Sequence, residues 1–540
     1  MPSPILPPAG NYDPGGKHDP ADKHDPAEQG MLKKSLSVSA LTMASRVLGL
    51  VRDMILAWLL GAGATADAFF VAFKLPNFVR RLVAEGAFSQ ALVPVLLDYR
   101  RRQAQQELQQ LLSQLTRALL LVLLGLGLLL WLLSPWLLLL LAPGYHAEPE
   151  QWRLTLSLFR WLLPYLLLSF LVAYASALLH SLSRFILPAC MPLILNLSMI
   201  AAALLLLGWL AWSVHALALA VVLAGLLQLL VQLPALKRAG ILPAWRTAKA
   251  APSAWPLLRA IVPALMAVSL AQVLLLLDTI LATLLQQGAV SWLYYADRLL
   301  ELPQGLIAVA LSIVILPVLS QAYSSGDQSG FKAVMAWSMR LVALLGVPAA
   351  LALYYLALPI MATLFMYGVM TASDIQQSAK ALQGYSLGLL AMMLLKVLLP
   401  AAYAAAQGAL VRRSALYALL LALALKLSLM QLWGHLGLAL ATSVGLWCMA
   451  LLLSLGLAKQ ALLPSFIQVM QSLVRPILAS LVMLLLLHLW LPEADWWLAA
   501  QAGSRIGLLS LAVALGAGCY VLLMLLLGFR WSWLRFTSQS

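Results

Sequence analysis

Hydrophobic residues along this chain come in long runs that short polar segments interrupt. Most runs hold about 20 or more mainly apolar residues, which is the length that an α-helix needs to cross a membrane. With proline, glycine and clusters of charge as boundaries, the pattern predicts about 14 membrane spans. The predicted spans cover residues 36–60, 66–98, 112–142, 152–181, 185–209, 212–236, 255–286, 289–321, 331–358, 375–405, 414–433, 435–458, 464–491 and 500–528.

Composition agrees with this pattern. Of the 540 residues, 63% are hydrophobic and only 10% are charged, and the mean hydropathy is +0.93. Soluble domains are about 45–50% apolar and about 25% charged, so the chain is too apolar to fold in water. We therefore expect an all-α polytopic membrane protein. Its connecting segments are too short to hold a soluble catalytic domain.

Positive charge alternates from one connecting segment to the next. Arg100 to Arg102 and the pair Arg412 and Arg413 follow even-numbered spans, whereas the segments that follow odd-numbered spans hold almost no lysine or arginine. Segments rich in these residues stay in the cytoplasm, so the pattern places both termini there. The net charge of +15 thus reflects membrane orientation. We expect no nucleic-acid partner, because no basic patch is interleaved with stacking aromatic residues.

Charged residues also lie inside the predicted spans, where they are costly and mark cavities, pathways or internal ion pairs. Arginine suits bidentate binding of phosphate, so Arg46, Arg52 and Arg298 predict a cavity with excess positive charge that binds an anion. Internal ion pairs are the alternative for Asp53, and Arg298 is spaced to pair with Glu301 three residues later. Further charged residues lie in the second predicted span, namely Asp67, Lys74, Arg80, Arg81 and Glu85, and in the eighth, namely Asp297.

Two more charges are isolated in apolar sequence. Asp278 stands in the seventh span and Lys426 in the eleventh, each without an opposite charge nearby in the sequence. One hypothesis is that they pair with each other. The alternative is that Asp278 carries a coupling proton or sodium ion.

Sequence motifs for catalysis are missing. The chain has no nucleophile elbow, no H-E-x-x-H zinc motif and no phosphate-binding P-loop. We therefore predict a protein that is not an enzyme and that uses no cofactor and no metal.

The first 30 residues differ from the rest. They are rich in Pro, Gly, Asp, Lys and His and contain the near-repeat KHDPAD and KHDPAE at residues 17–22 and 23–28. This composition predicts a disordered tail. Met31 is a second candidate for the start of translation.

Two long stretches carry a family resemblance. Residues 42–96, TMASRVLGLVRDMILAWLLGAGATADAFFVAFKLPNFVRRLVAEGAFSQALVPVL, and residues 291–321, SWLYYADRLLELPQGLIAVALSIVILPVLSQ, closely resemble the MurJ (MviN) family of lipid II flippases. That family belongs to the multidrug/oligosaccharidyl-lipid/polysaccharide exporter superfamily. The resemblance runs from about Met31 to the C-terminus.

The resemblance implies two six-helix lobes around a central cavity, followed by two helices that form a groove for a lipid tail. It places the cavity arginines of the family on Arg46, Arg52 and Arg298, and its essential acidic residue on Asp67. Arg80 and Glu301 fall on further charged positions of the family, and with Glu85 and Asp297 we expect them to gate or to form charge pairs. The implied domains are a cytoplasmic tail at 1–30, an N-lobe at 31–238, a C-lobe at 239–458 and a groove with a short tail at 459–540.

The resemblance also implies a function. The cargo would be lipid II, the undecaprenyl-diphosphate-linked precursor of peptidoglycan, moved across the bacterial inner membrane by alternating access. Membrane potential or an ion gradient would drive this transport. We expect a monomer that contacts membrane lipids, with the cell-wall synthesis machinery as a candidate partner. The alternatives are a flippase for another polyprenyl-diphosphate-linked glycan, or a drug/cation antiporter of the same superfamily.

Two further expectations concern movement and coupling. Gly61, Gly63 and Gly86, with Pro76, are the predicted bending points, and a kink or break is expected at Pro76. Some members of the family bind sodium through an acidic residue in span 7 and polar residues in spans 11 and 12. Here Lys426 stands where an Asn is common, so its ammonium group would take the place of the cation.

Overall fold

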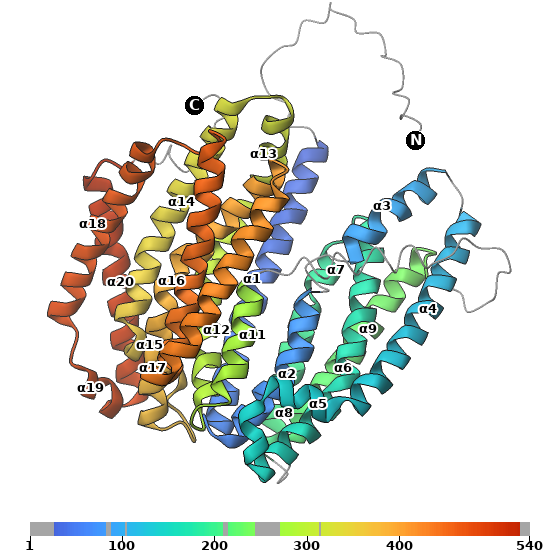
Figure 1. Cartoon of the computed structure of the whole chain (residues 1–540), viewed down its shortest axis with the longest axis horizontal. Coiled ribbons are helices and arrows are strands. Elements are labelled where there is room, and N and C mark those ends of the chain that lie inside the picture. The colour runs from blue at the N-terminus through green and yellow to red at the C-terminus, as the bar shows by residue number, and fades with distance from the viewer. Residues whose placement is uncertain are drawn as a thin grey trace, which may run out of the picture.

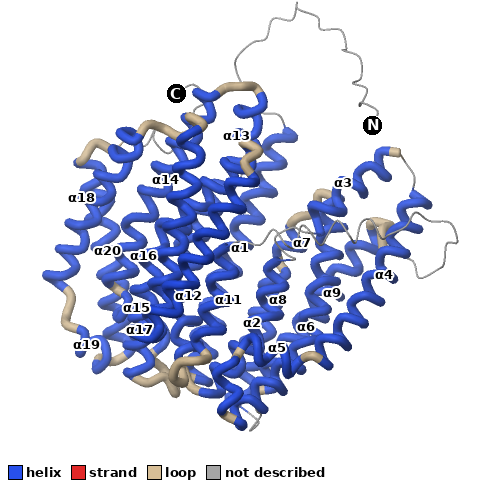
Figure 2. Tube along the Cα trace, viewed as in Figure 1, coloured by secondary structure: helices blue, strands red, loops and turns tan. Residues whose placement is uncertain are grey.

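The computed structural model describes residues 26–82, 88–102, 105–208, 214–242, 270–312 and 315–529. All regular structure in these ranges is helical (Figure 2). Nine of the described helices are long and apolar enough to cross a membrane. The protein is therefore an all-α integral membrane protein, as its sequence predicts. The count of 14 crossings stays a prediction.

Helices of the first half pack around α6. This helix contacts α2 and α3 on one side and α9 on another, while α1 contacts α8. In Figure 1, α2 to α9 of this first helix group lie at the right, with α4 at the outer edge, whereas α1 lies nearer the centre, beside α12. Its elements are α1 (Pro26–Leu60), α2 (Ala64–Leu82), α3 (Phe88–Arg101), α4 (Gln105–Leu132), α5 (Ser134–Leu141), the 3₁₀ turn η2 (Pro143–Ala147), α6 (Pro149–Ser181), α7 (Ile186–Ala189), α8 (Met191–Gly208) and α9 (His215–Arg238).

Helices of the second half pack around α16. It contacts α12, α14 and α17, while α18 and α20 pair with each other beside α14 (Figure 1). The elements of this second helix group are α11 (Leu270–Ala282), α12 (Ala289–Ser312), α13 (Ile315–Ser324), α14 (Gln328–Tyr355), α15 (Ala357–Phe365), α16 (Ala372–Ala404), α17 (Gly408–Lys459), α18 (Phe466–Trp490), α19 (Ala494–Ala499) and α20 (Ala502–Leu526).

The 52 residues of α17 form two helical segments. Gly434 between them has φ 56° and ψ −132°, a conformation outside the helical region that glycine adopts readily. A Cβ on Gly445 would lie 2.7 Å from Ala422, and one on Gly456 would lie 2.4 Å from Leu410. These contacts pair positions on either side of Gly434, so the two segments run antiparallel. The break falls between predicted spans 414–433 and 435–458.

The N-terminal boundary differs from the prediction. Helix α1 begins at Pro26, so residues 26–30 of the predicted tail are helical. Proline suits the first position of a helix because its fixed φ is helical and it lacks an N–H that would go unpaired there. The rest of the predicted tail lies outside the described residues.

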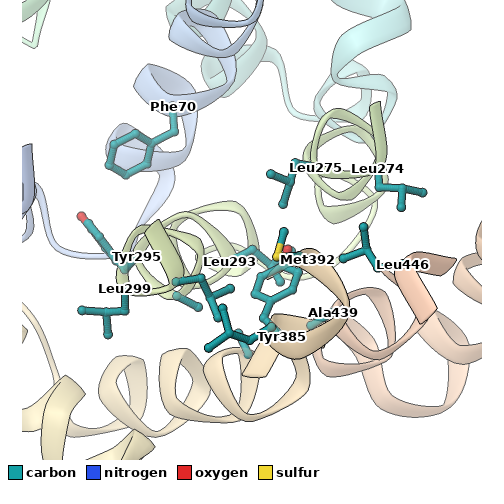
Figure 3. Close-up of a cluster of buried hydrophobic side chains, with 14 of the residues drawn as sticks. Phe70, Leu274, Leu275, Leu293, Tyr295, Leu299, Tyr385, Met392, Ala439 and Leu446 are labelled. Carbon is teal, nitrogen blue, oxygen red and sulfur yellow. The ribbon is translucent and has the colours of Figure 1, made fainter. Parts of the chain in front are cut away.

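The two helix groups approach each other at one end. We call this the junction end and the opposite one, where α1 begins and α20 ends, the terminal end (Figure 1). A continuous apolar core spans both groups. In it, Phe70 of α2 meets Tyr295 of α12 edge to face, with ring centroids 5.5 Å apart (Figure 3). Aromatic contacts of this kind hold the two groups together.

Candidate functional site: a basic cavity between the helix groups

A cavity of about 700 Å³ lies between the two helix groups. Helices α1, α2, α6, α8 and α9 line one side, and α11, α12 and α16 line the other. Arginines at four positions dominate its polar wall. The charged residues that line it are Arg46, Arg52, Arg80, Arg298, Lys396 and Glu301.

Arg46 reaches from α1 to α12. Its guanidinium group donates a hydrogen bond to the carbonyl oxygen of Glu301. A Cβ on Gly305 would lie 2.9 Å from Cδ of Arg46, so the glycine leaves room for the arginine to lie along α12. The predicted anion-binding residue thus sits at the contact between the two groups.

Arg52 and Arg298 share one carboxylate. Nη2 of Arg52 lies 2.6 Å from Oδ1 of Asp53, while Arg298 pairs with the other oxygen, Oδ2. Asp53 is fully buried. Nη1 of Arg52 also donates to Oδ1 of Asn196 on α8, at 2.9 Å. The cluster therefore ties α1 to α8 within its group and to α12 across the cavity.

Tyr294 completes this cluster. Its hydroxyl accepts a hydrogen bond from Arg52 at 3.0 Å and donates to Asp53 at 3.1 Å. Its ring stacks on Phe70 with centroids 3.9 Å apart. Nothing in the sequence marked Tyr294, because Arg52, Asp53 and Phe70 lie more than 220 residues before it. The same holds for Asn196, whose only signal was a polar side chain within an apolar run.

The charge in the cavity is more balanced than the sequence suggested. Arg298 forms an ion pair of 2.5 Å with Glu301, in addition to its contact with Asp53. Five basic side chains and one acidic side chain line the cavity. Counting Asp53 as well, the basic side chains exceed the acidic ones by three. Arg80 contributes to this excess and donates to Oδ1 of Asn77 at 2.8 Å.

Asp67 lies at the junction end, far from the arginines. It stands in the first turn of α2 and is 1% exposed. Its carboxylate accepts hydrogen bonds from the backbone nitrogens of Gly288 and Ser291, at 2.7 and 2.9 Å. Those groups form the N-terminus of α12, where unpaired N–H groups and the helix dipole attract an anion. Asp67 thus caps a helix of the opposite group.

Other close contacts reinforce the junction end. A Cβ on Gly144 would lie 1.8 Å from the carbonyl oxygen of Thr283, so η2 packs directly on the backbone after α11. Nε2 of Gln287 lies 3.2 Å from Oε2 of Glu148 across the same interface. Both contacts join the first group to the second.

Asp278 and Lys426 form a buried ion pair. The hydroxyl groups of Thr442 and Tyr385 donate to Oδ2 of Asp278, at 2.7 and 3.0 Å. Lys426 also donates to Thr442 and, at 3.4 Å, to the carbonyl oxygen of Leu438. The ammonium group therefore lies among three oxygen atoms. This pair joins α11 to both segments of α17.

The remaining predicted residues are more scattered. Asp297 and Lys74 line a small pocket beside Asp278. Gly61 ends α1 with φ +64°, whereas a Cβ on Gly63 would meet nothing within 4 Å. Helix α2 continues past Pro76 to Leu82 without the predicted break. Glu85, Gly86 and the side chain of Arg81 lie outside the described residues.

The fold resembles those of solved polytopic membrane proteins. A solved structure described as an inward-facing multidrug resistance MATE family transporter of the MOP superfamily matches with a TM-score of 0.61 at 14% identity, covering 79% of this chain and 98% of that one. A structure of lipid II flippase MurJ in an inward closed conformation matches with a TM-score of 0.76 at 23% identity, covering 91% of this chain and 98% of that one.

Sequence comparison identifies the family. The family model described as lipid II flippase MurJ matches residues 56–499. Lipid II flippase MurJ of Burkholderia cenocepacia is 36% identical over 510 residues, which cover 94% of this chain and 99% of that relative. A probable lipid II flippase MurJ of Vibrio cholerae is 38% identical over 511 residues, covering 93% and 97%. The chain belongs to the MurJ family, a family of membrane transporters and not of enzymes.

Proposed function

We propose that this protein flips lipid II from the cytoplasmic to the periplasmic leaflet of the inner membrane by alternating access, with both termini in the cytoplasm. The basic cavity carries the proposal. A diphosphate headgroup needs several fixed cations in a space shielded from water, and arginine offers paired N–H donors that match phosphate oxygens. Arg46, Arg52 and Arg298 are the proposed ligands of the diphosphate.

The arrangement of the cavity supports inward-facing binding. Its lining residues on α1 run from Val38 to Arg52, so the last two turns of that helix, which lead to the junction end, do not line it. Toward the junction end, the stacked rings of Phe70 and Tyr294 and then the Asp67 contacts lie across the path. Cargo would enter from the terminal end, and the Asp67 contacts would break to release it on the other side. Gly61, Gly63 and Pro76 are proposed to absorb the movement.

A second cavity supports a place for the lipid tail. It measures about 730 Å³ and lies between α14, α18 and α20. Apolar side chains such as Leu344, Ile467 and Met524 make up much of its wall, which suits a polyprenyl chain. The tail would stay among these helices while the headgroup crosses between the two groups.

Membrane potential is the proposed driving force. Moving one elementary charge through 100 mV is worth about 2.3 kcal/mol, so a net charge carried with each conformational cycle would bias the direction of transport. The Asp278–Lys426 pair is proposed to be structural, because the lysine ammonium already neutralises the carboxylate. A drug/cation antiporter is disfavoured by the excess of basic side chains in the cavity.

Exposure of lipid II on the cell surface tests this function. Cells depleted of their own flippase would receive the wild-type chain, Arg298→Ala or Arg184→Gln, and periplasmic lipid II would be scored by an added enzyme that cleaves it. Arg184 is an exposed arginine outside the cavity and serves as the matched control. We expect the wild type and the control to restore exposure and Arg298→Ala to lose most of it. Failure of a membrane-inserted wild type would reject lipid II as the cargo.

A further inference from the structure

A third cavity, of about 650 Å³, opens on the outer side of the first helix group, between α4, α6 and α9. These three helices lie side by side at the right of Figure 1. Two arginines of α6 line it, Arg153 and Arg160, together with Trp131 and Trp161. The described residues that line it include no carboxylate.

Arg160 is fixed within this cavity. Its Nε donates to Oγ of Ser134 at 2.8 Å, and its guanidinium carbon lies 4.9 Å from the ring centroid of Trp131. The contact with the ring is a cation–π interaction. An arginine that simply extends to the membrane surface would keep its guanidinium in water. Here two contacts hold the group against the end of α4 and the start of α5.

Arg160 also lies within α6, one of the helices long and apolar enough to cross a membrane. Eleven residues separate it from Pro149, the start of the helix, which corresponds to about 16 Å along the axis. A charge at such depth is costly unless an opposite charge accompanies it. Among the described residues, no carboxylate forms an ion pair with Arg160 or Arg153.

Arg153 lies on the same face, seven residues or about two turns before Arg160. Its Nε donates to the carbonyl oxygen of Pro149 at 3.2 Å, so its other N–H groups remain available toward the cavity. Leu156, Leu219 and Val222 form the apolar part of the wall. The site thus presents two cations over an apolar floor, next to tryptophans of the kind that sit at membrane interfaces.

We propose that this cavity binds the phosphate headgroup of an anionic phospholipid from the leaflet at the junction end. The phosphate diester would accept hydrogen bonds from Arg160 and Arg153, and an acyl chain would lie along the apolar wall. The observations favour a lipid over a protein partner because the site lies within the membrane-spanning part of α6. It is separate from the basic cavity between the helix groups, since the two share no lining residue.

Native mass spectrometry of the purified full chain tests the site. The probes are phosphatidylglycerol, which carries a net negative charge, and zwitterionic phosphatidylcholine. The wild type should retain phosphatidylglycerol preferentially, and the double variant Arg153→Gln/Arg160→Gln should bind it roughly tenfold more weakly, because charge-assisted hydrogen bonds are lost. Arg184→Gln, an exposed arginine beyond the other end of α6, should bind like the wild type.

Further variants separate this site from a structural role. Arg160→Lys keeps the charge but loses the planar donor fork, so its affinity should fall between those of the wild type and the double variant. Trp131→Leu is the alternative test if the double variant does not fold. It leaves both charges in place but removes the ring that Arg160 contacts, so retention of phosphatidylglycerol should weaken. Excess inorganic phosphate should not displace the lipid.

Four results would overturn the proposal. The first is equal retention of both lipids by the wild type, and the second is unchanged retention of phosphatidylglycerol by the double variant. The third is displacement by inorganic phosphate, which would identify a site for the free anion. An equal loss in Arg184→Gln would also contradict it, because the effect would then be one of total surface charge.

Discussion

The carboxylate of Asp67 lies 2.9 Å from the backbone nitrogen of Ser291, a residue 224 positions further along the chain. The serine hydroxyl donates to the same oxygen, at 2.5 Å. One side chain of the first helix group therefore caps the first turn of α12 in the second group. Under the proposed alternating access, this contact would break when the junction end opens, so one acidic residue would report the conformation of the protein.

Asp67→Asn should weaken closure of the junction end. Loss of the charge removes charge-assisted hydrogen bonds worth roughly 1.5–3 kcal/mol each, so the population with the helix groups apart should rise at least tenfold. Spin labels at Glu148 and Gln287, which face each other across the junction, would report longer distances. Asp327→Asn is the control, because Asp327 caps α14 in the second group. The same shift in the control would contradict a specific role for Asp67.

Gly144→Ala should open the same junction by steric contact. The new methyl group would lie 1.8 Å from the carbonyl oxygen of Thr283, which backbone movement alone can relieve. Gly125→Ala in α4, where the methyl group meets nothing within 4 Å, should behave like the wild type. Label distances at the junction and transport in cells would measure both variants. Wild-type behaviour of Gly144→Ala would show that close packing of η2 is dispensable.

Lys426→Met should destabilise the second helix group. It leaves the Asp278 carboxylate buried without a counter-charge, which costs about 3–5 kcal/mol. The double variant Asp278→Asn/Lys426→Met should regain much of this loss. Thermal unfolding in detergent would compare them. Wild-type Tm should also be the same in sodium and in potassium, and a rise specific to sodium would contradict the role of Lys426 as the resident cation.

Asp53→Asn tests the balance of charge in the basic cavity. Without the carboxylate, Arg52 and Arg298 lose their shared partner, so Tm should fall. The freed guanidinium groups should bind pyrophosphate roughly tenfold more tightly than in the wild type, because the anion no longer competes with Asp53. Isothermal titration would measure the affinity. Equal affinity would indicate that the cluster is a structural ion pair and not a phosphate site.

Hydrophobic patterning was sufficient to predict the class of fold. Where the long apolar runs fall on described residues they are largely helical, and the turn at Gly434 falls between two predicted spans. Local spacing was also informative, since Arg298 and Glu301 pair at i and i+3. Helix α2 passes through Pro76 because a proline inside a helix removes one hydrogen bond without necessarily ending it.

Contacts between distant segments could not be predicted in the same way. The sequence suggested excess positive charge at Arg52 and Arg298, but only the packing of α1 against α12 reveals that Asp53 lies between them. Two of the partners of Asp67 are backbone N–H groups, which every sequence offers at many places. The contacts of Arg160 with Ser134 and Trp131 are likewise visible only in the packed structure.

A reversible lock across the junction end tests the central claim of alternating access most directly. Cysteines would replace Glu148 and Gln287 in a chain whose native Cys190, Cys448 and Cys519 are removed, and a short reducible thiol cross-linker would join them. Single-cysteine chains treated with the same reagent are the control. The account predicts that cross-linking stops the exposure of lipid II in the periplasm and that reduction restores it. Continued exposure with the lock in place would contradict the account.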